Sequence, residues 1–289
     1  MDRIGVIGTG LMGGAVAARL VDRGYVVFTR DIRPVADAAA RASGATICAT
    51  PAEVARAAPL VIILVIDGAQ VEAVLFGPDG VVGAMAAGGI VVLSSTLAPD
   101  FVARMARGME AAGLQLIDAP VSGGPVRARD GSMTVMVGAP PALMDQLRPL
   151  FADIAGPLFH VGPAAGDGSK AKIVNNMIGG TVLVASCEGM ALGMKLGLDP
   201  AMLFDVVMAS AGGSFMFGSR MPRVLADDFT PHAAMRILNK DLGLALAAAG
   251  AAGSRVPLAT LASDVFQTTI AAGHGDKDDA AVINYYRDV

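Results

Sequence analysis

The feature that most constrains the fold is a glycine-rich turn, Gly8-Thr9-Gly10-Leu11-Met12-Gly13, between a strand-like run at 3–8 and a helix-like segment at 13–24. In such a strand–turn–helix unit the first glycine permits the tight turn and the second lets a pyrophosphate approach the backbone. The third glycine lets the helix pack closely on the strand. The helix N-terminus then holds the phosphates. The sequence therefore predicts a dinucleotide site whose cofactor-binding residues are Gly8, Gly10, Leu11, Met12 and Gly13.

An acidic residue follows at the spacing that this site needs. Asp31 lies 18 positions after Gly13, at the end of the predicted strand 26–31, where a carboxylate can accept hydrogen bonds from the adenosine ribose. A glycine-rich turn followed by a solvated aspartate is the alternative. The carboxylate favours NAD because it repels a 2'-phosphate, but NADP stays possible because Arg30 and Arg33 flank Asp31.

Strand-like and helix-like segments alternate as far as residue 163, and the remainder of the chain has helical patterns only. This order predicts an α/β protein: a Rossmann-type, doubly wound parallel sheet in domain 1–163 and an all-α domain at 164–289. A long helix at about 168–195 begins the second domain. The predicted strands are 3–8, 26–31, 60–66, 89–95, 114–120 and 133–138, and the later helices are 200–210, 214–225, 231–252 and 257–272.

Composition excludes several classes of partner. The net charge is −4 and the sequence contains no run of Lys or Arg, so we expect neither nucleic acid nor an anionic membrane surface as a partner. Cys48 and Cys187 have no cysteine or histidine at ligand spacing, which predicts no disulfide, no metal site and a cytoplasmic location. The most apolar segment, 177–194, contains Glu188 and is predicted to be a buried helix rather than a membrane span.

Four polar residues stand at the start of that long apolar helix: Lys170, Lys172, Asn175 and Asn176. Lys172 and Asn176 are four residues apart and share one face, whereas Lys170 lies about 200° around the helix from Lys172. Polar groups on one face of a buried helix need partners or a ligand, unless both are solvated at the helix end. An ammonium group there can stabilise an alkoxide and exchange its proton, which makes Lys172 the candidate acid/base and Asn176 its orienting partner.

Four segments closely resemble the signature segments of the β-hydroxyacid dehydrogenases, and they occur in the family's order: 5–20, 118–138, 166–176 and 239–245. The resemblance implies a Rossmann domain, a long interdomain helix and an all-α domain that often builds a homodimer or homotetramer. It also implies reversible, metal-free hydride transfer between NAD(P) and a short 3-hydroxyacid or its semialdehyde.

The resemblance assigns the substrate residues. Placing Gly166, Gly168, Asn175 and Asn176 on the family's pattern puts Lys172 at the catalytic position, with Asn176 beside the substrate. The segment Ser122-Gly123-Gly124 corresponds to the one that binds the substrate carboxylate, although its residues alone indicate only a turn.

The resemblance also assigns further cofactor contacts. Val65 and Ile66 contact the cofactor through main chain, and Thr96 lies near the nicotinamide unless it caps the helix after Pro99. Lys240 reaches the cofactor and Asp241 supports the site, unless the two form an exposed charge pair.

Several related functions stay open. They are a short 6-phosphogluconate dehydrogenase, an NADP-dependent semialdehyde reductase, an imine reductase and a non-catalytic nucleotide-binding protein, the last two of which are expected to lack the lysine. The sequence departs from the family at Ala233, eight positions before Asp241, where an aromatic residue is common. A small side chain widens the predicted pocket, and Phe215, Phe217 and Arg220 are candidates for lining it.

Overall fold

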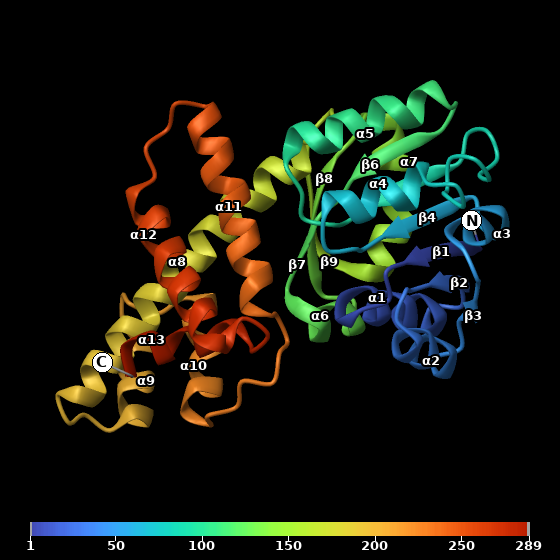
Figure 1. Cartoon of the computed structure of the whole chain (residues 1–289). Coiled ribbons are helices and arrows are strands. Elements are labelled where there is room, and N and C mark those ends of the chain that lie inside the picture. The colour runs from blue at the N-terminus through green and yellow to red at the C-terminus, as the bar shows by residue number, and fades with distance from the viewer. Residues whose placement is uncertain (1, 288–289) are drawn as a thin grey trace. The chain divides into compact units, whose positions relative to one another are not determined.

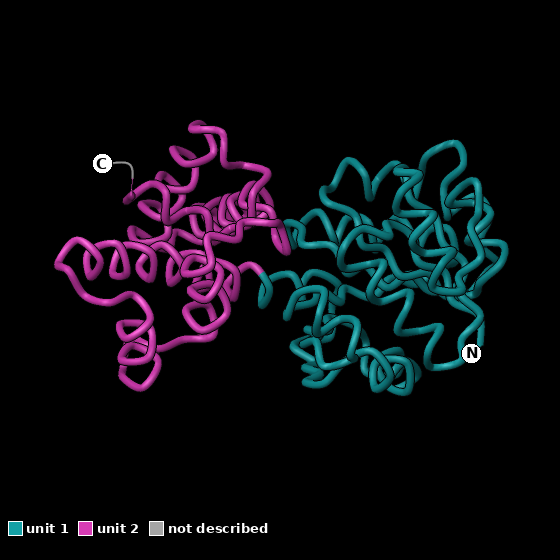
Figure 2. The backbone as a smooth tube through the Cα atoms, turned by 90° about the horizontal axis from the view of Figure 1, so that it is seen from below, with its two compact units in different colours: residues 1–172 teal, residues 173–289 magenta. Residues whose placement is uncertain are grey.

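The computed structural model describes residues 2–287, which form two compact units that divide between Lys172 and Ile173 (Figure 2). The sequence predicts a domain boundary between residues 163 and 164, which is directly after the last strand at Gly162. The structural division lies nine residues later. Residues 167–172, the start of a long helix, group with the first unit because the helix N-terminus is hydrogen-bonded to Asp118.

Within the described residues, nine strands form one sheet in the first unit (Figure 1). Their order is β3-β2-β1-β4-β5-β6-β8-β7, and β9 pairs with β8. The strands are β1 (Arg3–Ile7), β2 (Val26–Arg30), β3 (Thr46–Ile47), β4 (Leu60–Ile63), β5 (Ile90–Leu93), β6 (Gln115–Asp118), β7 (Val121–Ser122), β8 (Met133–Gly138) and β9 (Ala155–Gly162).

The path from β3 to β6 is parallel throughout and has the order of a doubly wound dinucleotide-binding sheet, which confirms the predicted fold class. β8 departs from the prediction because it runs antiparallel to β6 and β7. β9 is also absent from the predicted strands. Most of its residues are exposed or half-buried, so it lacks the continuous apolar run of a central strand.

The helices fall into the two units. In the first unit they are α1 (Leu11–Asp22), α2 (Pro34–Ala42), α3 (Pro51–Ala57), α4 (Gly68–Phe76), α5 (Pro99–Ala111), α6 (Gly124–Asp130) and α7 (Pro141–Ile154). The long helix α8 (Asp167–Lys195) continues into the second unit. The second unit also contains α9 (Pro200–Met208), α10 (Phe215–Leu225), α11 (Met235–Ala251), α12 (Pro257–Thr269), a π-helical turn (Ile270–His274), a 3₁₀ helix (Asp279–Ile283) and α13 (Asn284–Arg287).

The sheet is covered on both faces, as its strand pattern requires. In β4, Leu60 and Ile62 belong to a core with α1 and α7, while Val61 and Ile63 belong to a core with α3, α4 and α5. Because alternate side chains of a strand point to opposite faces, a strand between two helical layers must be apolar at every position. The buried core on both faces holds the strands in place. The turn after β1 lies at their carboxyl ends.

The second unit packs around α8. Leu183, Cys187 and Met190 on this helix are at most 1% exposed and share a core with α10, α11 and α12. Among the described helices, α8 is long and apolar enough to cross a membrane by length and composition alone, and these buried contacts make it a core helix.

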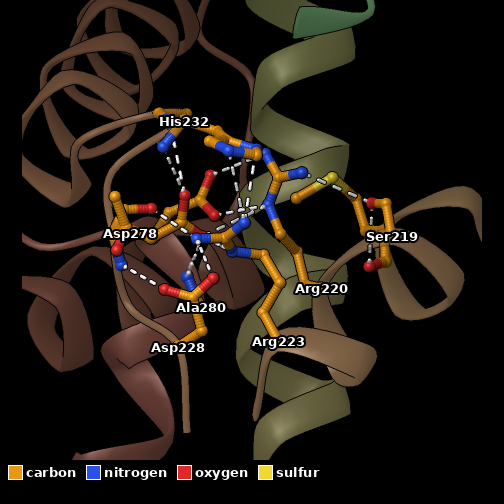
Figure 3. A network of polar contacts seen from close by, with 11 residues as sticks. Ser219, Arg220, Arg223, Asp228, His232, Asp278 and Ala280 are labelled. Atoms are coloured by element: carbon orange, nitrogen blue, oxygen red, sulfur yellow. Dashed lines mark hydrogen bonds and ion pairs between the residues drawn. The ribbon is translucent and has the colours of Figure 1, made fainter. Parts of the chain in front are cut away.

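A buried ion-pair network joins α10 to the 3₁₀ helix in the second unit (Figure 3). Arg220 donates to both oxygens of Asp279, at 2.5 and 3.1 Å, and Arg223 pairs with Asp278 at 3.3 Å. Burial raises the pKa of Asp279 to about 6, although Arg220 opposes the rise. The Asp278 carboxylate also accepts hydrogen bonds from the amides of His232 and Ala233, so it fixes the segment that leads into α11.

Phe217 is a structural residue rather than a candidate for the pocket wall. It is 3% exposed, and its ring stacks on Phe204 with 5.7 Å between centroids. Phe215, two residues earlier, is 64% exposed because it lies on the opposite side of the first turn of α10.

Candidate functional site

The turn between β1 and α1 has the geometry that its glycines predict. Gly8 has a φ of +88° and lies against the carbonyl of Leu64, so a side chain is excluded there. A Cβ atom on Gly13 would overlap the carbonyl oxygen of Gly8. The turn is therefore a close backbone cradle with no room for a side chain at Gly8 or Gly13, which fits the pyrophosphate of a dinucleotide.

The N-terminus of α1 is open to an anion. Gly10 occupies its N-cap position and has no side chain with which to cap the helix. The first amides of a helix have no partner within the helix, and they favour a negatively charged ligand. Leu11 and Met12 provide these amides in the first turn.

Asp31 follows the last residue of β2 and is 6% exposed. Burial by itself raises the pKa of Asp31, but hydrogen bonds from Arg33 bring it below its ordinary value. The Arg33 amide donates to Oδ1 at 2.9 Å, while its guanidinium donates to Oδ1 at 3.1 Å and to Oδ2 at 3.2 Å. Asp31 is thus an ionised, buried acceptor beside the cradle, and the interpretation as a solvated aspartate is wrong.

Arg33 reaches back towards the glycine turn. A Cβ atom on Gly10 would lie 3.1 Å from its terminal nitrogen, so the guanidinium covers the second glycine. Arg30 instead pairs with Asp37 at 3.3 Å, and Asp37 also accepts from the amide of Asp31 at 3.0 Å. Of the two flanking arginines, Arg33 is the one placed beside both Asp31 and the cradle.

The segment after β4 differs from its prediction. The strand ends at Ile63 rather than at residue 66, and Val65 and Ile66 lie in the loop that follows. Their amides donate to Ser95 Oγ at 3.0 Å and to Gln70 Oε1 at 2.9 Å. These bonds tie the loop to Ser95 and to the first turn of α4. Contact of this loop with the cofactor stays a prediction.

Thr96 does not cap the helix after Pro99. The N-cap position of α5 is Ala98, two residues further on, so the capping interpretation is wrong. Thr96 lies in the loop after β5, at the same carboxyl edge of the sheet as the glycine turn.

Ser122, Gly123 and Gly124 connect the short strand β7 to α6, and all three are half-buried. Gly123 has a φ of +128°, and a side chain there would come within 2.9 Å of the Arg127 side chain. The segment therefore presents bare backbone and one hydroxyl, which are groups that can bind a carboxylate.

Burial separates the two lysines at the start of α8. Lys170 is 67% exposed on its side chain and pairs with Asp167 at 2.8 Å, whereas Lys172 is 7% exposed. The helix is continuous from Asp167 to Lys195, so Lys172 and Asn176 lie on one face, one turn apart. Burial of an ammonium group is costly unless the group is paired or hydrogen-bonded.

Within the second unit, Asn176 belongs to a polar cluster with the two residues predicted on α11. Asn176 Nδ2 donates to Asp241 Oδ2 at 2.7 Å, and Lys240 Nζ donates to Asp241 Oδ1 at 2.7 Å. Asp241 is 4% exposed, so an exposed charge pair is the wrong interpretation. One buried carboxylate holds both neighbours in fixed orientations.

Family models match both units. Residues 3–162 match the NAD-binding domain of 6-phosphogluconate dehydrogenase, and residues 166–286 match the NAD-binding region of NADP-dependent 3-hydroxyisobutyrate dehydrogenase. An L-threonate dehydrogenase of Cupriavidus necator is 41% identical over 98% of this chain and 95% of that protein. The chain belongs to the β-hydroxyacid dehydrogenase family.

Two further relatives support the assignment. A 3-hydroxyisobutyrate dehydrogenase of Pseudomonas aeruginosa is 35% identical, with 99% of both chains covered. The crystal structure of a 3-hydroxyisobutyrate dehydrogenase from Salmonella typhimurium is 36% identical, covers 98% of this chain and 99% of that one, and superposes with a TM-score of 0.92. The protein is an NAD(P)-dependent hydroxyacid dehydrogenase rather than a non-catalytic nucleotide-binding protein.

One residue near the predicted site of this dehydrogenase was missed by the sequence analysis. Asp118 ends β6 and is completely buried, and its carboxylate accepts three hydrogen bonds from residues at the start of α8. Burial raises its pKa to about 6, while the bonds from Ser169 and Gly166 oppose the rise. The available signal was an aspartate inside an otherwise apolar strand, within a segment already singled out for Ser122.

Proposed function

We propose that this dehydrogenase oxidises a short hydroxyacid of the L-threonate kind with NAD, and that Lys172 is the general acid/base. The observation that carries the catalytic assignment is the burial of Lys172, 7% exposed, on the helix face that also bears Asn176. The similarity to L-threonate dehydrogenase along almost the whole chain supports the substrate class.

The residues divide the chemistry between them. When bound, NAD(P)⁺ would accept the hydride from the substrate. The neutral amine of Lys172 accepts the proton of the substrate hydroxyl during oxidation, and the ammonium returns it during reduction. Asn176, held by Asp241, orients the substrate, while Ser122 and the backbone of Gly123 and Gly124 bind its carboxylate.

The small side chain at position 233 supports a substrate with several hydroxyl groups. Ala233 replaces the aromatic residue common in the family, and its amide is anchored to Asp278 at 3.3 Å. A methyl group leaves room for additional hydroxyl groups on a four-carbon acid. L-threonate carries three hydroxyl groups and one carboxylate, and the carboxylate suits the proposed binding segment Ser122–Gly124.

The test is a substrate panel with both cofactors. L-threonate, 3-hydroxyisobutyrate, 6-phosphogluconate, succinic semialdehyde and a cyclic imine are compared by initial rates in the appropriate direction. We expect the highest kcat/KM for L-threonate with NAD⁺, and the position of the new carbonyl is read by NMR. Preference for 6-phosphogluconate, the semialdehyde or the imine would instead support the corresponding alternative.

Cofactor choice depends on Asp31 in this proposal. We expect Asp31→Ala to lower kcat/KM for NAD⁺ about 10- to 100-fold, since a hydrogen bond to a charged group is worth about 1.5–3 kcal/mol. The same variant should gain on NADP⁺, because the negative charge that opposes the 2'-phosphate is removed. Initial rates with each cofactor measure both effects.

Two variants serve as controls for this result. Asp22→Ala removes a half-exposed carboxylate that pairs with Arg129, and it should leave both cofactors unaffected. Arg33→Ala distinguishes an NAD-specific site from an NADP-specific site, because Arg33 lies beside both Asp31 and Gly10. A wild-type preference for NADP⁺ that Arg33→Ala abolishes would overturn the assignment to NAD.

The proposal includes a homodimer or homotetramer in the cytoplasm. Large apolar side chains are exposed in the second unit, as expected of a surface that a second copy covers. They include Leu192, Leu196, Met202, Leu258 and Leu261, each at least 58% exposed. Light scattering coupled to gel filtration gives the mass, and a monomer at micromolar concentration would contradict the oligomer.

A further inference from the structure

Asp118 lies between two segments of the proposed site in the first unit. It is the last residue of β6, and the chain continues from it to Ser122, Gly123 and Gly124. Its side chain contacts the start of α8 instead. Oδ2 accepts from the amides of Gly166 and Ser169 at 2.9 and 2.7 Å, and Oδ1 accepts from Ser169 Oγ at 2.9 Å.

These bonds make Asp118 the cap of α8. The first amides of a helix need an acceptor from outside the helix. The helix's own first acid, Asp167, is engaged elsewhere, because its carboxylate accepts from the Ala164 amide at 3.0 Å and from Lys170 Nζ at 2.8 Å. A carboxylate from a residue 51 positions earlier than Ser169 takes the place of a local cap.

The same bonds fix the rotation of the first turn. Ser169 precedes Lys172 by three residues and Asn176 by seven, so the three lie on one stripe of the helix. Asp118 holds Ser169 by both its amide and its hydroxyl. Gly168 lets the first turn of α8 pack closely against the end of β6. A Cβ atom at this position would lie 2.8 Å from the Asp118 carbonyl oxygen and 3.0 Å from Pro120.

We infer that Asp118 is a positioning residue, which holds the first turn of α8 so that Lys172 stays in register with the carboxylate-binding segment Ser122–Gly124. The inference rests on the proposed function, since it takes Lys172 as the acid/base. Burial raises the pKa of Asp118 to about 6, so the carboxylate is ionised in assays at a pH well above that value. Asp118 does not touch the substrate, and it acts through the helix.

The first experiment compares Asp118→Ala with Asp118→Asn. The alanine variant loses all three acceptor contacts, and we expect kcat to fall about 10- to 100-fold from misplacement of Lys172. The Kd for NADH, measured by fluorescence titration, should stay within threefold of wild type, and the titration also counts the folded sites. Asparagine should restore kcat to about a third of wild type or more, since its oxygen can accept both amides and its amide can donate to Ser169 Oγ.

The second experiment does not depend on activity. An amine-reactive reagent labels the wild-type protein and the variants, and peptide fragmentation distinguishes Lys172 from Lys170. Lys170 is 67% exposed and serves as the internal reference. We expect labelling of Lys172 relative to Lys170 to increase several-fold in Asp118→Ala, with Ser169→Ala between that variant and wild type.

Asp199→Ala is the matched control. Asp199 caps α9 by accepting from the Met202 amide at 2.8 Å, so this variant loses a cap of the same chemistry at a helix that bears no proposed site residue. It should change neither kcat nor the labelling of Lys172. Unchanged labelling in Asp118→Ala, or in Ser169→Ala if the former does not fold, would overturn the inference. Increased labelling with full activity in Lys172→Ala would instead leave the positioning intact and refute the acid/base role.

Discussion

We expect Lys172→Ala to lower kcat about 10²- to 10⁴-fold, the usual contribution of a general acid/base, while the Kd for NADH changes little. The reason is that Lys172 is the buried lysine of α8, 7% exposed, and sits one turn before Asn176. Without its amine, the substrate hydroxyl loses the base proposed to take its proton. Stopped-flow measurement of NADH formation with L-threonate reports the chemical step.

Lys170→Ala is the matched control for this prediction. Lys170 lies two residues earlier on the same helix, but its side chain is 67% exposed and its pairing with Asp167 is a surface salt bridge. Such a pair contributes about 0–1 kcal/mol to stability, so kcat should stay at the wild-type value. Lys172→Arg tests the proton directly, because a guanidinium keeps the charge but cannot become neutral. Wild-type oxidation rates in Lys172→Ala or Lys172→Arg would contradict the acid/base role.

Local patterns were sufficient for the features that depend on neighbours in the sequence. The glycine turn, the aspartate that follows β2 and the alternation of strands and helices each follow from spacing. Helical periodicity also separated Lys172 from Lys170, and the structure gives the two lysines opposite burial. In each case the pattern lies within a short stretch of the sequence.

The residues that the sequence did not reveal depend on partners far away in the chain. Asp118 bonds to Gly166 and Ser169 across 48 and 51 residues. Asp278, which anchors the segment before α11, accepts from His232 across 46 residues. A polar residue at such a position looks the same in sequence whether it is solvated or is the buried acceptor of several amides. Only the fold distinguishes the two.

Gly13→Ala should lower kcat/KM about 100-fold, the size of effect expected when a binding segment moves by about 1 Å. A Cβ atom on Gly13 would overlap the carbonyl oxygen of Gly8, and both partners of that clash are backbone or directly attached to it. α1 must therefore move away from β1, which displaces the amides proposed to hold the pyrophosphate. The Kd for NADH and the thermal midpoint should both worsen.

Gly14→Ala isolates this effect from helix propensity. Gly14 is the next residue of α1, and its Cβ atom would lie 3.1 Å from the Thr9 carbonyl oxygen, a contact that a small shift relieves. Replacement of glycine by alanine within a helix favours the helix by about 1 kcal/mol, and this gain applies to both variants. Gly14→Ala should then equal or exceed wild-type stability and keep its affinity for NADH, while Gly13→Ala loses both. Equal behaviour of the two variants would show that close packing of Gly13 on Gly8 does not determine the geometry of the dinucleotide site.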